Sequence, residues 1–119
     1  MAITGIHTLL YTSEPEAVRN ILRDVFGWKH VDAGGDWLIF ALPPAEIAMH
    51  PAEAGGAFEF YLTCDDLEAE MRDLRAKGVA CSDVEEARWG SITKITLPGG
   101  GEIGLYQPKH PTAIRAPRS

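Results

Sequence analysis

The chain has few cysteines, few basic residues and no long apolar run. Its two cysteines, Cys64 and Cys81, each lie within an apolar stretch, which favours reduced core thiols over a disulfide framework. Lys and Arg total 11 against 17 Asp and Glu, so the net charge of −6 would repel a phosphate backbone. No apolar run approaches the roughly 18 residues of a membrane helix, and no charged leader precedes the first strand-like segment. These absences predict a cytoplasmic protein that binds neither nucleic acid nor membrane.

An internal repeat divides the chain into two similar halves. The length of 119 residues suits a single domain. Residues 7–26 align with residues 59–78 at an offset of 52. The identical pairs are Leu10/Leu62, Glu16/Glu68, Ala17/Ala69, Leu22/Leu74 and Arg23/Arg75. A repeat of this kind predicts two copies of one structural unit.

Each half contains one amphipathic helical pattern. Ser13 with Glu16, and Asp65 with Glu68, have the spacing of a capping box, which predicts that a helix starts at each place. Apolar residues then recur at helical spacing in both halves. The two predicted helices therefore occupy equivalent positions in the repeat.

Strand-like segments surround both predicted helices. In the first half these segments are 3–12, 28–33, 36–42 and 46–50, and in the second they are 57–64, 79–87, 91–97 and 102–107. Glycine and proline residues separate them. The order in each half is βαβββ. We therefore predict an α+β domain over residues 1–119, with module one at about 3–50, module two at about 57–108 and an irregular tail at 109–119.

The tandem βαβββ order resembles the vicinal oxygen chelate superfamily, which includes glyoxalases, bleomycin resistance proteins and extradiol dioxygenases. The resemblance rests on the opening segment 7–14, HTLLYTSE, and on the closing segment 98–108, PGGGEIGLYQP. It implies two modules whose sheets form an incomplete barrel around a ligand cavity. It also implies a homodimer, which agrees with the usual pairing of exposed sheet edges.

The resemblance implies metal ligands on the first and last strands of each module. The first-strand positions hold His7 and Glu59, while the last-strand positions hold Ala48 and Gly104 in place of the usual glutamates. Because alternate strand residues share a face, His50 points the same way as Ala48. His7, His50 and Glu59 are therefore the predicted ligands of a divalent ion, Fe, Mn, Zn or Ni, with Glu102 in reserve.

Two functions remain open at the level of sequence. The first is a metal-dependent lyase or dioxygenase that acts on a small molecule with vicinal oxygens. The second is a metal-free protein of the bleomycin resistance type that binds or sequesters a small molecule, and the net charge of −6 suits a cationic ligand. The aromatic residues predicted to line the cavity are Tyr11, Trp37, Phe60 and Tyr106. The missing glutamates favour the second function, and the two histidines with Glu59 favour the first.

Overall fold

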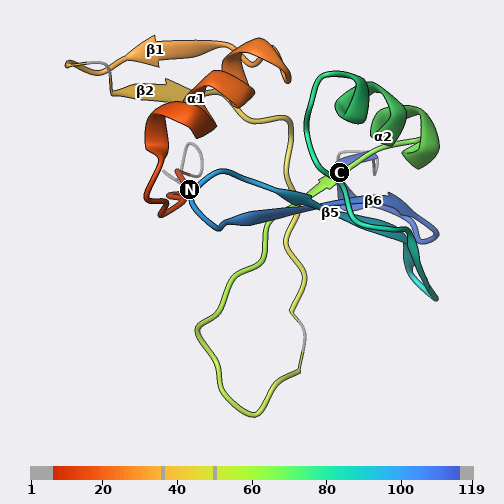
Figure 1. Cartoon of the computed structure of the whole chain (residues 1–119). Helices are drawn as coiled ribbons and strands as arrows, with labels where there is room; N and C mark the ends of the chain where they lie inside the picture. The colour runs from red at the N-terminus through yellow and green to blue at the C-terminus, as the bar shows by residue number, and fades with distance from the viewer. Residues whose placement is uncertain (1–6, 36, 50, 116–119) are drawn as a thin grey trace.

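The computed structural model describes residues 7–35, 37–49 and 51–115, and it is a mixed α+β structure (Figure 1). The predicted fold class is confirmed. In chain order the elements are α1 (Pro15–Asp24), β1 (His30–Asp32), β2 (Leu38–Phe40), β3 (Tyr61–Thr63), α2 (Leu67–Ala76), β4 (Glu85–Ala87), β5 (Gly90–Thr96), β6 (Glu102–Pro108) and the short 3-10 helix η1 (Ala113–Arg115). None of the helices in the described part of the chain is long and apolar enough to cross a membrane.

The second half of the chain forms a four-stranded sheet with the order β3-β6-β5-β4. The strands β3 and β6, the first and last of the module, pair in parallel, and the other pairs are antiparallel. The first half contributes the antiparallel pair β1–β2. Figure 1 shows this pair beside α1, away from the four-stranded sheet and α2.

Module one contains fewer strands than its sequence pattern predicts. Residues 7–12 and 46–49 match strand patterns, yet the structure forms no strand there, and the rest of the predicted segments 3–12 and 46–50 lies outside the described residues. In module two the predicted strand 57–64 is reduced to Tyr61–Thr63. A strand is stabilised by hydrogen bonds to a neighbour, and the described segments 7–12 and 46–49 have no neighbouring strand.

Both helices begin one residue later than the capping-box spacing predicts. The N-cap of α2 is Asp66, whose carboxylate accepts a hydrogen bond from the Ala69 amide at 3.1 Å. The N-cap of α1 is Glu14, which makes no side-chain capping bond. Pro15 at the first helical position lacks an amide hydrogen and favours helical backbone angles, so it sets this start.

The hydrophobic core lies between α2 and one face of the four-stranded sheet. Its buried members come from both helices, from Val79 and from the sheet region: Val18, Leu67, Met71, Leu74, Val79, Ile95, Leu97, Ile103 and Leu105. Val18 is the residue of α1 that joins this core. Cys64 and Cys81 pack against the same cluster and form no disulfide, as predicted.

The turn between β5 and β6 contacts the start of α1. The Thr12 hydroxyl donates a hydrogen bond to the Pro98 carbonyl at 2.8 Å. Gly99 has a positive φ of 84°, and a Cβ atom there would overlap the Thr12 hydroxyl. This position therefore requires glycine for its backbone angle and for the close approach of the two halves.

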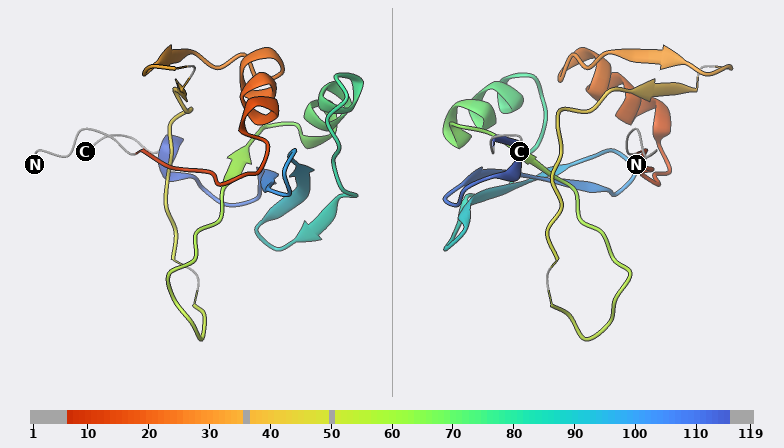
Figure 2. Two further views of the ribbon diagram at one scale, coloured as in Figure 1. Left: turned by 60° about the vertical axis from the view of Figure 1, so that its left-hand side comes forward. Right: turned by 180° about the vertical axis from the view of Figure 1, so that it is seen from behind.

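A long connection without helix or strand among its described residues joins β2 to β3. The described residues in the middle of this connection extend away from the sheet in Figures 1 and 2. Met49 and Phe58 on this connection, and Tyr11 on the first segment, are 85–87% exposed. Several large apolar side chains are therefore uncovered in the single chain.

Candidate ligand-binding face

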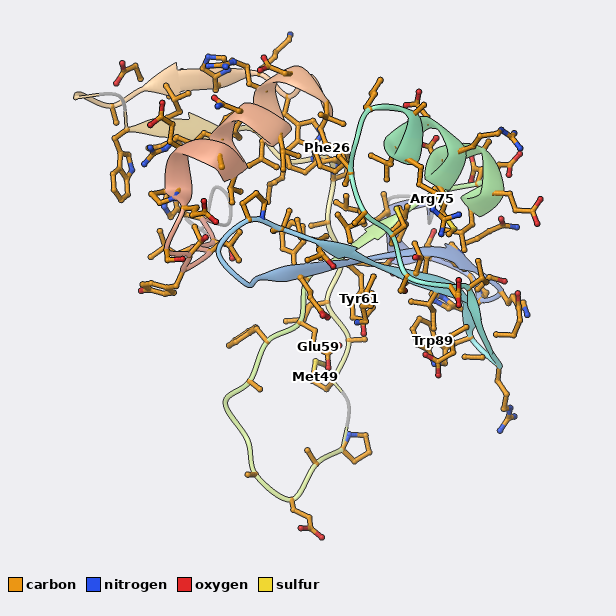
Figure 3. All side chains as sticks on the ribbon, viewed as in Figure 1. Phe26, Met49, Glu59, Tyr61, Arg75 and Trp89 are labelled. Carbon is orange, nitrogen blue, oxygen red and sulfur yellow. The ribbon has the colours of Figure 1, made fainter. Side chains whose placement is uncertain are left out.

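The sheet face opposite α2 holds a group of side chains that do not belong to the core. Register places Tyr61 opposite Gly104, and Gly104 opposite Lys94. Tyr106 pairs with Ile92, and both are buried outside the core cluster. We name this surface the open face and define it by Tyr61, Trp89, Ile92, Lys94, Gly104 and Tyr106. In Figure 3, Tyr61 and Trp89 lie below the sheet, while Arg75 of α2 lies above it.

Three aromatic rings contact one another on the open face. The ring centroid of Tyr61 lies 6.0 Å from that of Trp89 and 5.7 Å from that of Tyr106, and the third distance is 5.1 Å. All three contacts are edge-to-face, the arrangement that aromatic quadrupoles favour. His110 extends the group, because its Nε2 lies 3.4 Å from the Tyr106 hydroxyl. Trp89 is still 42% exposed, so the cluster offers an aromatic surface.

A hydrogen-bond chain connects a cation to a carboxylate through Tyr61. The Lys94 ammonium donates to the Tyr61 hydroxyl at 3.0 Å and lies 4.4 Å from the centroid of its ring. The same hydroxyl donates to Glu59 Oε2. Tyr61 thus acts as acceptor and donor at once, which fixes the position of its ring.

Gly104 makes this arrangement sterically feasible. A Cβ atom at position 104 would overlap the ring of Tyr61. The position that holds a metal-binding glutamate in the resemblance is therefore covered by a tyrosine ring.

Two groups of the open face have shifted pKa values. The hydrogen bond to Tyr61 raises the pKa of Lys94 more than burial lowers it, and the negative charges of Glu59 and Glu102 act in the same upward direction. Burial raises the pKa of the Tyr106 phenol, and Glu46 and Tyr61 add to that shift. At neutral pH the face therefore presents one ammonium and a protonated phenol at Tyr106.

The predicted ligands that the structure describes, His7, Glu59 and Glu102, are not part of a metal-binding cluster. His7 is exposed on a segment without regular structure, and Glu59 is exposed beside Tyr61. Glu102 is exposed at the start of β6. Within residues 7–35, 37–49 and 51–115, no three His, Cys, Asp or Glu side chains lie close enough to hold a metal ion. His50 lies outside the described residues, so the three-ligand set stays a prediction.

The predicted cavity-lining aromatic residues lie in four different surroundings. Tyr11 is exposed, and Trp37 is exposed at the entrance to β2, where Arg19 lies 5.8 Å from its ring centroid. Phe60 packs against the hydrophobic core, whereas Tyr106 lies in the aromatic cluster. Their binding roles stay predictions.

Sequence reasoning did not predict four members of the open face, namely Tyr61, Trp89, Ile92 and Lys94. One signal was present for Tyr61, because it is two residues after Glu59 and alternate strand residues share a face. Ile92 and Lys94 come to this face through the register of β5 with β6, which no local pattern predicts. For Trp89, which comes directly before β5, strand parity gives no such signal.

A separate surface groove of about 410 Å³ runs along α2 and β4. Its lining residues are Asp66, Leu67, Glu68, Val84, Glu86, Ser91 and Gln107. Several of these side chains already make hydrogen bonds within the fold. The Gln107 side chain accepts a hydrogen bond from the Leu67 amide, and the Glu86 carboxylate accepts one from the Ser91 hydroxyl. The lining has no aromatic side chain and no cation, so the open face is the better candidate for a ligand site.

Comparison with known proteins places this fold in a superfamily. No protein-family model and no curated protein matches the sequence significantly. Among solved structures, the antibiotic-binding protein TnmS3 from a Streptomyces species is 26% identical, with a TM-score of 0.67 over 92% of this chain and 99% of that chain.

Two further structures share the fold at lower identity. A lactoylglutathione lyase from Agrobacterium tumefaciens is 16% identical, with a TM-score of 0.62 over 90% of this chain and 96% of that chain. A member of the glyoxalase/bleomycin resistance protein/dioxygenase superfamily from Sphaerobacter thermophilus is 18% identical, with a TM-score of 0.61 over 90% of this chain and 99% of that chain. The chain has the fold of the vicinal oxygen chelate superfamily, and the resemblance predicted from its sequence is confirmed.

Proposed function

We propose that the protein binds a small aromatic molecule on the open face without using a metal ion. The observation that carries this proposal is the contact of Tyr61, Trp89 and Tyr106 beside the Lys94 ammonium. Binding sites for small molecules are mostly apolar and aromatic, with a few polar groups that orient the ligand. The open face has that composition.

The donor set of the open face does not fit a divalent ion. Ala48 and Gly104 supply no carboxylate at the last-strand positions. The Lys94 ammonium already offsets part of the negative charge of Glu59 and Glu102, so these carboxylates attract a second cation less strongly. The metal-dependent alternative, in which His7, His50 and Glu59 hold Fe, Mn, Zn or Ni for a lyase or dioxygenase reaction, stays a prediction that the experiment below also tests.

Similarity to TnmS3 supports a binding role. That protein is described as antibiotic-binding, and it matches almost the whole of both chains. A protein that sequesters a toxic molecule needs affinity and no catalytic group. We infer the same class of activity for this chain, with free thiols that suit the reducing cytoplasm.

We also propose that the protein works as a homodimer. The exposed apolar side chains on segments 7–11 and 41–58 are Leu9, Leu10, Tyr11, Leu42, Ile47, Met49 and Phe58. Exposed apolar patches and unpaired strand-like segments are typical of protein contacts. Light scattering should give the mass of two chains, and a monomeric mass would contradict this proposal.

Thermal shift and calorimetry with a panel of flat aromatic compounds test the binding function. We expect at least one compound to raise the Tm of the metal-free protein, and Trp89→Ala to abolish that rise because it removes the exposed ring. The control is Val31→Ala, which truncates an exposed apolar side chain on β1, outside the open face. If ligands bind only after Fe, Mn, Zn or Ni is added, and His7→Ala prevents this, the metal-free proposal is wrong.

A further inference from the structure

The row Tyr61, Gly104, Lys94 across the open face determines what a ligand would meet next to the aromatic rings. The three residues lie side by side on β3, β6 and β5. Because Gly104 has no side chain, the Tyr61 ring lies over it and its hydroxyl reaches the Lys94 ammonium. The ammonium is thereby held on the same face as the aromatic cluster.

The Lys94 ammonium keeps hydrogen-bonding capacity for a ligand. An ammonium has three N–H donors, and in the described part of the chain Lys94 uses one of them, on Tyr61. The ion pairs recorded among the described residues do not include Lys94. The negative charges of Glu59 and Glu102 act on the ammonium without forming an ion pair with it, and the Tyr61 hydroxyl bonds both Lys94 and Glu59.

The aromatic surface and the cation are both neighbours of Tyr61. The ring centroids of Trp89 and Tyr61 lie 6.0 Å apart in an edge-to-face contact. The Lys94 Nζ atom lies 4.4 Å from the centroid of the Tyr61 ring. A ligand that packs on Trp89 and extends across Tyr61 would therefore meet an N–H donor. A substituent that accepts hydrogen bonds matches that donor, whereas a cationic substituent meets a like charge.

We propose that Lys94 is a specificity-determining residue that selects an acceptor oxygen, a carboxylate or a carbonyl, on the aromatic ligand. This inference rests on the proposed binding function and gives the chemistry of the ligand. It differs from the expectation based on net charge, because the total of −6 describes the whole chain while the aromatic cluster has an ammonium beside it.

Three probes of similar shape test this selection by calorimetry: naphthoate, acetylnaphthalene and naphthylmethylammonium. We expect naphthoate and acetylnaphthalene to bind the wild type more tightly than the ammonium probe. Lys94→Met should weaken naphthoate binding about tenfold, the effect of removing one charge-assisted hydrogen bond. Lys94→Arg should keep most of the affinity, because it restores the charge and the donors.

The control variant is Lys77→Met, which removes the same charge from the exposed Lys77–Asp73 pair on α2. It should leave naphthoate binding unchanged. Retained binding of the ammonium probe, together with an unchanged circular dichroism spectrum, shows that Lys94→Met is folded.

The outcomes separate the two proposals. If none of the three probes binds the wild type, the binding function and the role of Lys94 both fail. If the ammonium probe binds as tightly as naphthoate, or if Lys94→Met leaves their affinity ratio unchanged, the role of Lys94 fails while the binding function stands.

Discussion

Module one and module two share a sequence pattern but differ in how much sheet they form. In module two, four strands pair beneath α2, and this module supplies eight of the nine residues of the buried core. Module one forms α1 and the short pair β1–β2, and Val18 is its one fully buried core residue among those described. Helices close their hydrogen bonds locally, whereas strands need a partner distant in sequence. The comparison indicates that module two is the stable unit on which module one depends.

Removing core volume from module two should have the largest effect. Ile95 is fully buried on β5, so Ile95→Ala should lower the free energy of unfolding by about 2–5 kcal/mol. Val31→Ala on β1 deletes apolar atoms from an exposed side chain, so it should change stability by about 0.5 kcal/mol or less. Urea denaturation measures both values. Equal losses in the two variants would contradict the dominance of module two.

Adding a side chain at Gly104 should have the next largest effect on the free energy of unfolding. In Gly104→Ala the new methyl group overlaps the Tyr61 ring, so we expect a loss of about 1–3 kcal/mol. Gly55→Ala is the control, because a Cβ there meets no atom within 4 Å. Adding Tyr61→Ala to Gly104→Ala should remove the overlap. A double variant whose losses simply add would show that the ring and the methyl group do not clash.

The helix starts offer a smaller contrast between the modules. Asp66→Ala removes the hydrogen bond to the Ala69 amide at the start of α2 and should cost about 1 kcal/mol. Glu14→Ala at the equivalent place in α1 removes no side-chain capping bond and should have little effect. The Tm values of the two variants measure this difference. A loss in Glu14→Ala as large as that in Asp66→Ala would mean that α1 is capped in solution.

The reactivity of the Cys64 thiol should differ between the folded and the unfolded chain. Burial raises the pKa of Cys64 to about 11, and the nearby acidic residues Glu70 and Asp65 add to the shift. Only the thiolate reacts, so the rate of iodoacetamide modification at Cys64 should rise about tenfold per pH unit up to about pH 10. Peptide mass spectrometry follows the residue, with protein in urea as the reference. A rate that levels off near pH 9 would contradict the raised pKa.

The sequence predicted the helices better than the strands. The repeat located both helices, with an error of one residue at each start, because acidic or polar residues stand at two successive positions before each helix. Segments 7–12 and 46–49 have the residue pattern of strands. Such a pattern shows only which side chains would share a face, and a strand also needs a neighbouring strand to pair with. The parallel pairing of Tyr61 with Gly104 joins residues far apart in the chain. A local pattern cannot report such a contact.

The candidate site was predictable in its place but not in its chemistry. The resemblance pointed to Glu59 and Gly104, and both lie at or beside the open face. The sequence pattern did not predict the hydrogen bond of Lys94 to Tyr61, because this bond depends on the register of three strands. From the sequence alone, Gly104 is only a position that lacks the usual glutamate. In the structure it is the residue that admits the Tyr61 ring.

The contact between Gly99 and Thr12 limits how the sequences of the two halves of this chain can diverge. If the repeat arose by duplication, each copy could otherwise accumulate substitutions independently. Here the turn of one copy fits against the helix start of the other with no room for a side chain at position 99. A larger residue at position 99 would disturb both copies, so acceptable changes at positions 12 and 99 must occur together. The contact between Gly99 and Thr12 should therefore change more slowly in evolution than the exposed residues of the connection 41–60.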